Sequence, residues 1–391
     1  MDLAAFQHLR GERGADVLAA VAEHGTSADG LIGTINALRR SYPGDVVAAA
    51  VTQVRLRERA RPKFGADADV MFFTPDGVEQ ATRTSVARHR ATRLRRHEPA
   101  RLLDLCCGIG GDLIALARAG IAVTGVELDP LTVEVARANL QALGVDATVQ
   151  CADAESTDLE GWPAAFCDPA RRGSGRRIFD PRAYSPAIDV VWRMADQVPL
   201  AAAKLGPGIP HELVPGGVEA EWVSDSGAVK EATLWFGALA TTPRRATVLP
   251  SGDTLTDSGL GAPSVGAPGR WLYEPDGAVI RAHLVGEVAA RIEGRLLDAS
   301  IAYMSTDSLV STPFARAYEV TDVMPFSLKR LRALLRERGV GRLTVKKRGS
   351  AIDPAMLRRA LRLSGSEEAT VVLTRVAGAP TALICRPAPS P

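Results

Sequence analysis

Hydrophobic positions in the first 97 residues recur every three or four residues, which is the spacing of one face of an α-helix. Two such faces are formed by Val17, Leu18 and Val21 and by Leu31, Ile35 and Leu38. A further helix is predicted over residues 46–61, before a break at Pro62, and another over residues 78–96. The pattern therefore predicts a separate N-terminal helical domain over residues 1–97.

From residue 98 the pattern changes to short apolar runs that alternate with helical stretches, which is typical of a parallel α/β sheet. The predicted strands lie at residues 102–105, 121–126, 146–151, 165–167 and 200–204, with a closing antiparallel pair at 219–224 and 232–236. Predicted helices lie at residues 113–118, 132–143 and 187–196. Residues 98–245 are therefore expected to form one α/β domain.

The rest of the chain divides into two segments of different character. Residues 246–318 begin with a stretch rich in Gly, Pro, Ser and Thr and predict a linker or connector, with one helix at 280–297. Residues 319–391 predict a small α+β domain with helices at 327–338 and 354–363 and strands at 343–347, 369–375 and 381–386. This last segment carries fourteen basic and six acidic side chains, a net charge of +8.

Composition narrows the class of protein. The chain has 391 residues, of which 46% are hydrophobic and 24% charged, as in ordinary globular proteins with two or three domains. The net charge is only +2, so any surface for nucleic acid must come from local clustering. No apolar run reaches the roughly 18 residues of a membrane span, and the N-terminus lacks a signal pattern. Five cysteines without a disulfide framework indicate a reduced, cytoplasmic protein, and no metal-ligand pattern is present.

The sharpest motif is the glycine turn that follows the first predicted strand, Asp104-Leu-Cys-Cys-Gly-Ile-Gly-Gly-Asp112. A dinucleotide fingerprint starting at Gly108 would need a third glycine where the chain has Leu113. Glu127 ends the second strand, 19 residues after Gly108, where a carboxylate binds ribose hydroxyls in nucleotide-type folds. An ordinary tight strand-to-helix turn is the structural alternative.

A second motif, Asp168-Pro-Ala-Arg-Arg172, follows the fourth predicted strand. It resembles in part the Asp/Asn-Pro-Pro-aromatic motif of methyltransferases that act on nitrogens, which implies an oxygen that accepts a hydrogen bond from the target N–H and a rigid proline turn that aims this oxygen. Asp168 and Pro169 match that motif, whereas Ala170 and Arg171 stand where it has the second proline and the aromatic residue. Arg171 and Arg172 are candidates to bind phosphate or a carboxylate, or else to pair with Asp180 or Asp189. Cys167 as a nucleophile for a pyrimidine carbon is the less favoured alternative, because small cysteines are common on buried strands.

Together these blocks resemble the class I S-adenosylmethionine-dependent methyltransferases that carry a C-terminal THUMP-like domain. The resemblance covers nearly the whole chain and implies a Rossmann-like, seven-stranded α/β sheet with S-adenosylmethionine as cofactor. It implies that the methionine end binds at Asp104 and the glycine turn, the ribose at Glu127 and the adenine at Asp153. The residues implied in cofactor binding are Asp104, Cys106, Gly108, Ile109, Gly110, Gly111, Glu127, Leu128, Asp153, Ala154 and Asp168, and Asp168 and Pro169 are implied in catalysis.

The same resemblance implies an RNA substrate, tRNA or rRNA, methylated at a base nitrogen. A base inside a duplex would have to be flipped out, so loops and single strands are the expected targets. The predicted RNA contacts are Arg90, Arg93, Arg171, Arg172, Lys346, Lys347 and Arg348. Two alternatives remain open: a small-molecule methyltransferase, and a non-catalytic RNA-binding protein that retains the cofactor fold.

Overall fold

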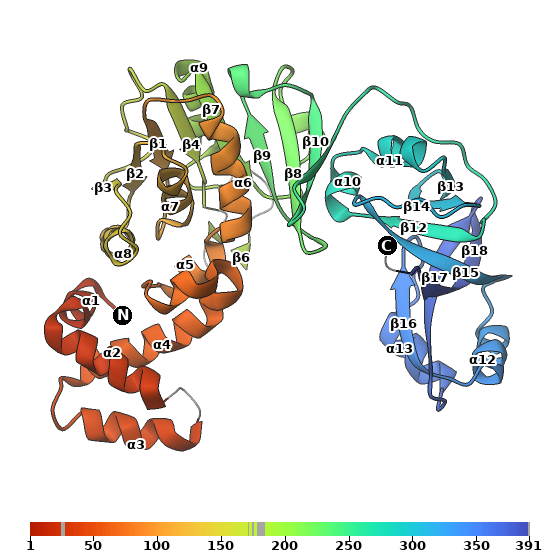
Figure 1. Ribbon diagram of the computed structural model, residues 1–391, viewed down its shortest axis with the longest axis horizontal. Helices are drawn as coiled ribbons and strands as arrows, with labels where there is room; N and C mark the ends of the chain where they lie inside the picture. Colours follow the sequence, from red (N-terminus) through yellow and green to blue (C-terminus); the bar gives the residue numbers. More distant parts are fainter. Residues whose placement is uncertain (25–27, 171, 174–175, 178–183, 390–391) are drawn as a thin grey trace. The chain divides into compact units, whose positions relative to one another are not determined.

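The computed structural model describes residues 1–24, 28–170, 172–173, 176–177 and 184–389. The chain forms two compact units (Figure 1). Unit 1 contains Met1–Glu219 and Glu231–Thr241, and unit 2 contains Ala220–Lys230 and Thr242–Pro391. The division runs through strand β9 (Ala228–Trp235), so the chain passes between the units three times.

Unit 1 begins with α-helices, as the three- and four-residue spacing predicts. They are α1 (Leu3–Arg10), α2 (Glu12–His24), α3 (Ala28–Leu38), α4 (Gly44–Phe64), α5 (Pro75–Gln80) and α6 (Thr84–Arg95). Helix α4 continues through Pro62 to Phe64, so the predicted end at Arg61 comes three residues too early, and Gly65 follows the helix with a positive φ of 59°.

The single helix predicted over residues 78–96 is wrong, because α5 and α6 are separated by Ala81 and Arg83, whose ψ angles of 139° and 142° are not helical. The Lys63 ammonium group explains the break. It donates to the carbonyl oxygens of Val78, Glu79 and Ala81 at 2.7, 2.7 and 2.9 Å. In a continuous helix these carbonyls would accept bonds from the next turn instead.

The sheet of unit 1 has the strand order β9-β7-β4-β1-β2-β3. Its strands are β1 (Leu102–Leu105), β2 (Val123–Glu127), β3 (Thr148–Cys151), β4 (Ala164–Cys167), β7 (Leu200–Leu205) and β9. All pair in parallel except β9, which runs antiparallel to β7. Helices α7 (Gly111–Arg118), α8 (Pro130–Ala142) and α9 (Ile188–Gln197) connect them, so the predicted order of strands and helices is confirmed.

The N-terminal helices share a core with this sheet. Phe6, Phe64 and Phe73 are buried in the same hydrophobic cluster as Leu102 of β1 and Phe166 of β4. Helices α1, α2 and α4 also enclose a smaller cluster of their own, which includes Val17, Val21 and Val47. Residue 97 is therefore not a boundary between two cores, in contrast to the separate helical domain expected from the sequence.

Unit 2 contains two groups of strands. In the first, β10 (Arg244–Leu249) pairs in parallel with β8 (Glu219–Asp225) and antiparallel with β11 (Asp253–Thr256). The second is a seven-stranded sheet with the order β13-β14-β12-β15-β18-β17-β16. Its strands are β12 (Trp271–Pro275), β13 (Arg295–Asp298), β14 (Ile301–Thr306), β15 (Ala315–Pro325), β16 (Val340–Lys347), β17 (Glu367–Val376) and β18 (Ala379–Pro387).

The segment 246–318 is consequently not a linker. Leu272, Leu297 and Tyr303 from this segment are buried with Leu383 and Cys385 from the end of the chain, in one cluster. The single helix expected at residues 280–297 is replaced by α10 (Gly277–Arg281), α11 (Val285–Arg291) and strand β13. His283 and Glu293 interrupt it, because both have left-handed φ angles, of 57° and 52°.

The predicted basic segment at the end of the chain does contain its helices, α12 (Leu328–Glu337) and α13 (Pro354–Leu361). A short two-stranded ribbon, β5 (Arg172–Gly173) and β6 (Arg176–Arg177), lies in unit 1 after β4. Among the residues that the structure describes, no helix is both long and apolar enough to cross a bilayer.

Replacing Phe73 with alanine should lower the free energy of unfolding by about 3–5 kcal/mol, because this fully buried ring packs 5.5 Å from the ring of Phe64 in the shared core. Urea unfolding followed by circular dichroism measures the change. Val70→Ala is the matched control, because that side chain is 46% exposed, and it should cost little. Loss of helical signal well before the rest of unit 1 unfolds would contradict the shared core.

Candidate functional site

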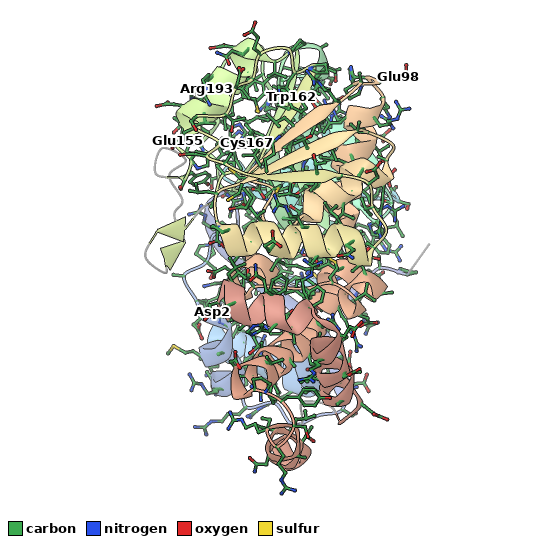
Figure 2. All side chains as sticks on the ribbon, turned by 90° about the vertical axis from the view of Figure 1, so that its left-hand side faces the viewer. Asp2, Glu98, Glu155, Trp162, Cys167 and Arg193 are labelled. Carbon is green, nitrogen blue, oxygen red and sulfur yellow. The ribbon has the colours of Figure 1, made fainter. Side chains whose placement is uncertain are left out.

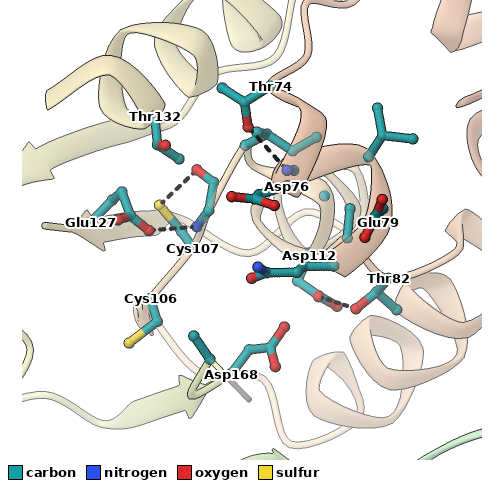
Figure 3. Close-up of a pocket in the computed structure, with 18 of the residues that line it drawn as sticks. Thr74, Asp76, Glu79, Thr82, Cys106, Cys107, Asp112, Glu127, Thr132 and Asp168 are labelled. Carbon is teal, nitrogen blue, oxygen red and sulfur yellow. Dashed lines mark hydrogen bonds between the residues drawn. The ribbon is translucent and has the colours of Figure 1, made fainter. Parts of the chain in front are cut away.

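A pocket of about 950 Å³ lies in unit 1 at the carboxyl ends of the parallel strands (Figure 3). The turn after β1, the end of β2 and the loop after β4 form one side. Residues 74 and 76–82, from the N-terminal helical region, form another side, and Lys204 of β7 lies among the lining residues. The carboxyl edge of a parallel sheet is where such folds bind ligands.

The turn after β1 is held in a tight conformation. Cys106 has a left-handed φ of 62°, which is uncommon outside glycine, and Gly110 reaches a φ of 90° as the N-cap of α7. The side chain of Asn139 on α8 fastens the turn by donating to the carbonyl oxygen of Ile109 at 2.9 Å. The same side chain also binds the backbone of Phe72, which ties the N-terminal region to the turn.

Glu127 lies where the sequence predicts it, at the end of β2 and in the pocket wall. Its two carboxylate oxygens accept from the backbone N–H groups of Gly108 and Asp129, each at 3.0 Å, and Figure 3 shows the first of these bonds. Each carboxylate oxygen has further lone pairs that can accept hydrogen bonds. The carboxylate is thus fixed in place and can still bind vicinal hydroxyls.

Asp104 presents a buried carboxyl group that lines the pocket. Its side chain is fully buried, and in the described part of the chain neither oxygen has a hydrogen-bond partner. Burial, followed by the nearby Asp112 and Asp168, raises the pKa of Asp104 well above its usual value. An unpaired buried carboxyl group fits a ligand that brings a positive charge or a hydrogen-bond donor, as the α-ammonium group of S-adenosylmethionine would.

A chain of buried ionic contacts and hydrogen bonds forms the floor of the pocket, and Figure 3 shows its link between Thr82 and Asp112. Lys204 Nζ donates to Asp168 Oδ2 and, at 2.9 Å, to the hydroxyl of Thr82. That hydroxyl donates to Asp112 Oδ2 at 2.7 Å. Behind Asp112, the guanidinium of Arg90 bonds to both Asp112 and Glu231. Alternating charges therefore compensate one another from the pocket inward.

Asp168 and Pro169 line the pocket, as expected. The Asp168 side chain is 24% exposed, so part of the carboxylate remains open. Burial raises the pKa of Asp168, and the contact with Lys204 opposes that shift. Ala170 is fixed by a β-bridge to Ser185. Arg171 lies outside the described residues.

Two predicted RNA contacts, Arg90 and Arg93, are wrong. Arg90 is only 2% exposed, and its guanidinium lies 4.4 Å from the centre of the Phe166 ring. Arg93 bonds to Glu219 at 2.6 Å and stacks over Trp235 at 4.1 Å. Charges on a helix usually face water, but here this face packs against the sheet, where buried carboxylates compensate it.

The adenine side of the predicted cofactor site is less enclosed. Leu128, Asp153 and Ala154 are not among the residues that line the pocket, and Leu128 is 64% exposed. Asp153 instead accepts from the N–H of Glu155 at 2.8 Å. Arg193 holds this loop by donating to the carbonyl oxygens of Ala154 and Glu155 at 3.0 and 2.5 Å (Figure 2). Adenine binding at Asp153 stays a prediction.

Cysteine chemistry is disfavoured at this site. Cys167 is fully buried on β4 (Figure 2). Cys106 lines the pocket, but its hydrogen bond to Cys167, then its burial, raise its pKa well above the usual value. Burial similarly raises the pKa of Cys107. A thiol with a raised pKa carries little thiolate at neutral pH, and the thiolate is the nucleophile.

The basic residues predicted in unit 2 are only partly available. Lys346 bonds to Glu274, and Arg348 lies 5.5 Å from the centre of the Tyr303 ring, whereas Lys347 is exposed. Unit 2 carries further arginines on α12 and α13. Arg332, Arg359 and Arg362 line a shallow hollow there, which has a volume of about 580 Å³.

Arg172, another predicted RNA contact, belongs to unit 1, where its backbone lies in β5.

Sequence reasoning missed Lys204, Thr82, Asp112 and Lys63 as lining residues. Lys204 did carry a signal, because a lysine inside the apolar run of β7 must find a partner when it is buried. Thr82 carried no such signal, since it lies in a stretch that was predicted to be one helix.

The ammonium group of Lys63 has a lowered pKa. Burial, then the charges of Lys204 and Arg83, lower the pKa of Lys63 to about 8. Across the described residues, no group of three or more His, Cys, Asp or Glu side chains could hold a metal ion.

Comparison with protein families matches three segments of this chain. Residues 102–167 match a methyltransferase domain, and residues 315–387 match a THUMP domain-like family. Residues 2–60 match a domain of unknown function. The first match contains the glycine turn, Glu127 and the strand before Asp168.

Comparison with whole proteins gives a relative along nearly the full length. An uncharacterized S-adenosylmethionine-dependent methyltransferase of Mycobacterium tuberculosis H37Rv is 38% identical over 366 residues, which cover 89% of this chain and 99% of that protein. A 23S rRNA (uracil(747)-C(5))-methyltransferase of Pyrococcus horikoshii is 38% identical over 76 residues, 19% of this chain and 18% of that enzyme. The crystal structure of a proposed methyltransferase from Porphyromonas gingivalis W83 has a TM-score of 0.75 at 22% identity, over 99% of this chain and 98% of that one.

Replacing Asp104 with asparagine should stabilise the free protein and weaken its binding of S-adenosylmethionine. The raised pKa of Asp104 means that the folded state holds a proton that the unfolded state has released, so wild-type stability falls as pH rises. The increase in the free energy of unfolding caused by Asp104→Asn should therefore be near zero at pH 4 and reach roughly 1–3 kcal/mol above pH 7.

Urea unfolding between pH 4 and 8 and titration calorimetry with S-adenosylmethionine test both parts. The affinity should fall about tenfold or more, because a charge-assisted hydrogen bond is lost. Asp146→Asn, an exposed carboxylate of the same unit, should change neither quantity. Unchanged affinity for S-adenosylmethionine would remove Asp104 from the binding site.

Proposed function

This chain belongs to the class I S-adenosylmethionine-dependent methyltransferases that carry a C-terminal THUMP-like domain, and we propose that it methylates a nitrogen of an RNA base, in tRNA or rRNA. The observation that carries the proposal is the position of Asp168. Its carboxylate follows β4 at the pocket, beside the glycine turn, with one oxygen held by Lys204. This arrangement suits an acceptor for an N–H group of the substrate.

S-adenosylmethionine supplies a methyl group on a positively charged sulfur that is already a good leaving group. The residues therefore mainly bind, orient and exclude water. Asp104 and the turn from Gly108 to Gly111 would hold the methionine end, and Glu127 would hold the ribose. Asp168 would accept a hydrogen bond from the acceptor nitrogen, aim its lone pair at the methyl carbon, and take up the proton that the nitrogen releases.

The charge of the pocket bears on how a nucleotide would enter. Its lining includes seven acidic and three basic side chains: Asp76, Glu79, Asp104, Asp112, Glu127, Asp129 and Asp168, against Arg59, Lys63 and Lys204. Even without Asp104, whose raised pKa disfavours its ionised form, six acidic side chains remain against three basic ones, and this excess attracts a cationic cofactor and repels phosphate. A flipped base would therefore enter the pocket while its phosphates stay outside. A neutral or cationic small molecule would meet the same attraction, and this favours small-molecule methylation as the second candidate.

RNA is favoured over a small molecule by the character of unit 2. Its THUMP-like segment carries a strong positive excess, which supplies sequence-independent affinity for phosphate backbones. Part of this chain also resembles enzymes whose names specify methylation of uracil C5 in 23S rRNA or tRNA. A nitrogen is proposed here instead of that carbon, because C5 methylation needs a thiolate, and the cysteines at this site are held as thiols.

Wild-type protein should transfer labelled methyl from S-adenosylmethionine to tRNA or rRNA from total cellular RNA, and Asp168→Ala should reduce the rate at least about 100-fold. Filter counting of size-separated RNA measures the transfer. Cofactor binding by the variant, measured on the same sample, checks that the pocket is intact. Asp158→Ala, an exposed carboxylate outside the pocket, should behave like wild type. Label that appears only in small metabolites would sink the RNA assignment and support the second candidate.

RNA in which 5-fluorouracil replaces uracil should form no covalent adduct with this protein. A C5 mechanism would add a cysteine to the base and then stall, because fluorine cannot leave as the C5 hydrogen does, and the adduct would survive denaturing gel electrophoresis. Cys106→Ser should accordingly keep most of the transfer activity. A stable adduct that disappears in Cys106→Ser would overturn the choice of nitrogen.

A further inference from the structure

Lys204 is an ammonium group buried in the middle of the sheet of unit 1. It lies on β7 between strands β4 and β9, and it is only 5% exposed. The three residues before it on this strand are buried alanines. Removing an ammonium group from water costs several kcal/mol unless close partners compensate it. Its contacts therefore indicate what it does.

These contacts divide the Asp168 carboxylate into two different oxygens. Lys204 Nζ bonds to Oδ2, and among the described residues no donor lies against Oδ1. The second contact of Lys204, with the Thr82 hydroxyl at 2.9 Å, fixes the direction of the ammonium group. Thr82 must accept from Lys204, because its own hydrogen is donated to Asp112 at 2.7 Å.

We propose that Lys204 is a positioning residue for methyl transfer, which holds one oxygen of Asp168 so that the other stays ionised and aimed at the acceptor nitrogen. The proposal rests on the proposed function, because it gives a role to the same carboxylate. Lys204 would act through Asp168, without contact with the methyl group. Thr82 would link this pair to Asp112 and so to the N-terminal helices.

The charges around Asp168 show why a cation is needed at this position. Asp112 on α7 opposes its ionisation, and burial raises the pKa of Asp168. Asp104 on β1 is a further carboxyl group nearby, and Cys106 is a thiol. Arg90 on α6 is a nearby cation, but its guanidinium bonds to Asp112 and Glu231. Lys204 is therefore the cation that directly contacts Asp168 among the described residues.

Without Lys204, the partial burial of Asp168 and the carboxyl groups beside it would act with less opposition, so the pKa of Asp168 would rise further and more of its carboxyl group would be protonated. A protonated carboxyl group is a poor acceptor for an N–H group and cannot take the proton that the nitrogen releases. The loss of activity should then depend on pH. A merely structural lysine would lower the rate by a similar factor at every pH.

The test compares the pH dependence of methyl transfer to RNA for wild type, Lys204→Met and Lys204→Arg. Lys204→Met should lower kcat about 10- to 100-fold at pH 7, with a partial recovery toward pH 9 and little change in KM for S-adenosylmethionine. Lys204→Arg keeps the charge and should keep the wild-type profile. In an Asp168→Asn background, Lys204→Met should have little further effect, because the residue through which it acts is gone.

A second measurement does not need the RNA. In protein with ¹³C-labelled aspartate carboxyl groups, the resonance that disappears in Asp168→Asn reports the titration of Asp168. Its midpoint should rise in Lys204→Met and stay near wild type in Lys204→Arg. A midpoint that does not move, or a rate loss equal at every pH, would overturn the proposal. If this midpoint moves while no RNA is methylated, the role of Lys204 stands and only the RNA substrate is refuted.

Discussion

The guanidinium group of Arg90 is the contact on which the rest of unit 1 depends. It is buried between Asp112 and Glu231 and lies over the ring of Phe166. Three parts of the chain meet at this one side chain, namely α6, α7 and β9. Burial by itself lowers the pKa of Arg90, but the two carboxylates outweigh it and raise the pKa. Loss of either partner would leave an uncompensated charge in the interior, which is far more costly than loss of a surface ion pair.

This compensation determines what the pocket can offer a ligand. Because Arg90 engages Asp112, Asp112 can hold the hydroxyl of Thr82, and the hydroxyl in turn holds Lys204. Arg90 and Lys204 are thus engaged with carboxylates, while the buried carboxyl group of Asp104 has no hydrogen-bond partner among the described residues. The inner part of the site is therefore neutralised, while acidic side chains outnumber basic ones over the whole lining. Such a site attracts cations through side-chain charges that are fixed in the structure.

The parts of the site that could be predicted lie close together in the sequence. Asp104 lies near the end of β1, Glu127 ends β2 and Asp168 follows β4, and parallel strands bring their carboxyl ends to one edge. The break between α5 and α6 could not be predicted, because it is made by Lys63 from a preceding helix. The burial of Arg90 depends on Glu231, 141 residues away. The strands within residues 271–306 were likewise missed, because they are only four to six residues long and β12 is separated from β13 by two short helices.

The path of the chain between the two units also sets the order in which unit 1 can fold during synthesis. β9 supplies Glu231 and pairs with β7, yet it follows residues 220–230, which belong to unit 2. At about 5–20 residues per second, the ribosome makes Glu231 roughly 7–28 s after Arg90. Until then the nascent helix α6 carries a guanidinium with only part of its final partners. The last steps of folding in unit 1 must therefore wait for a segment made after most of its sheet.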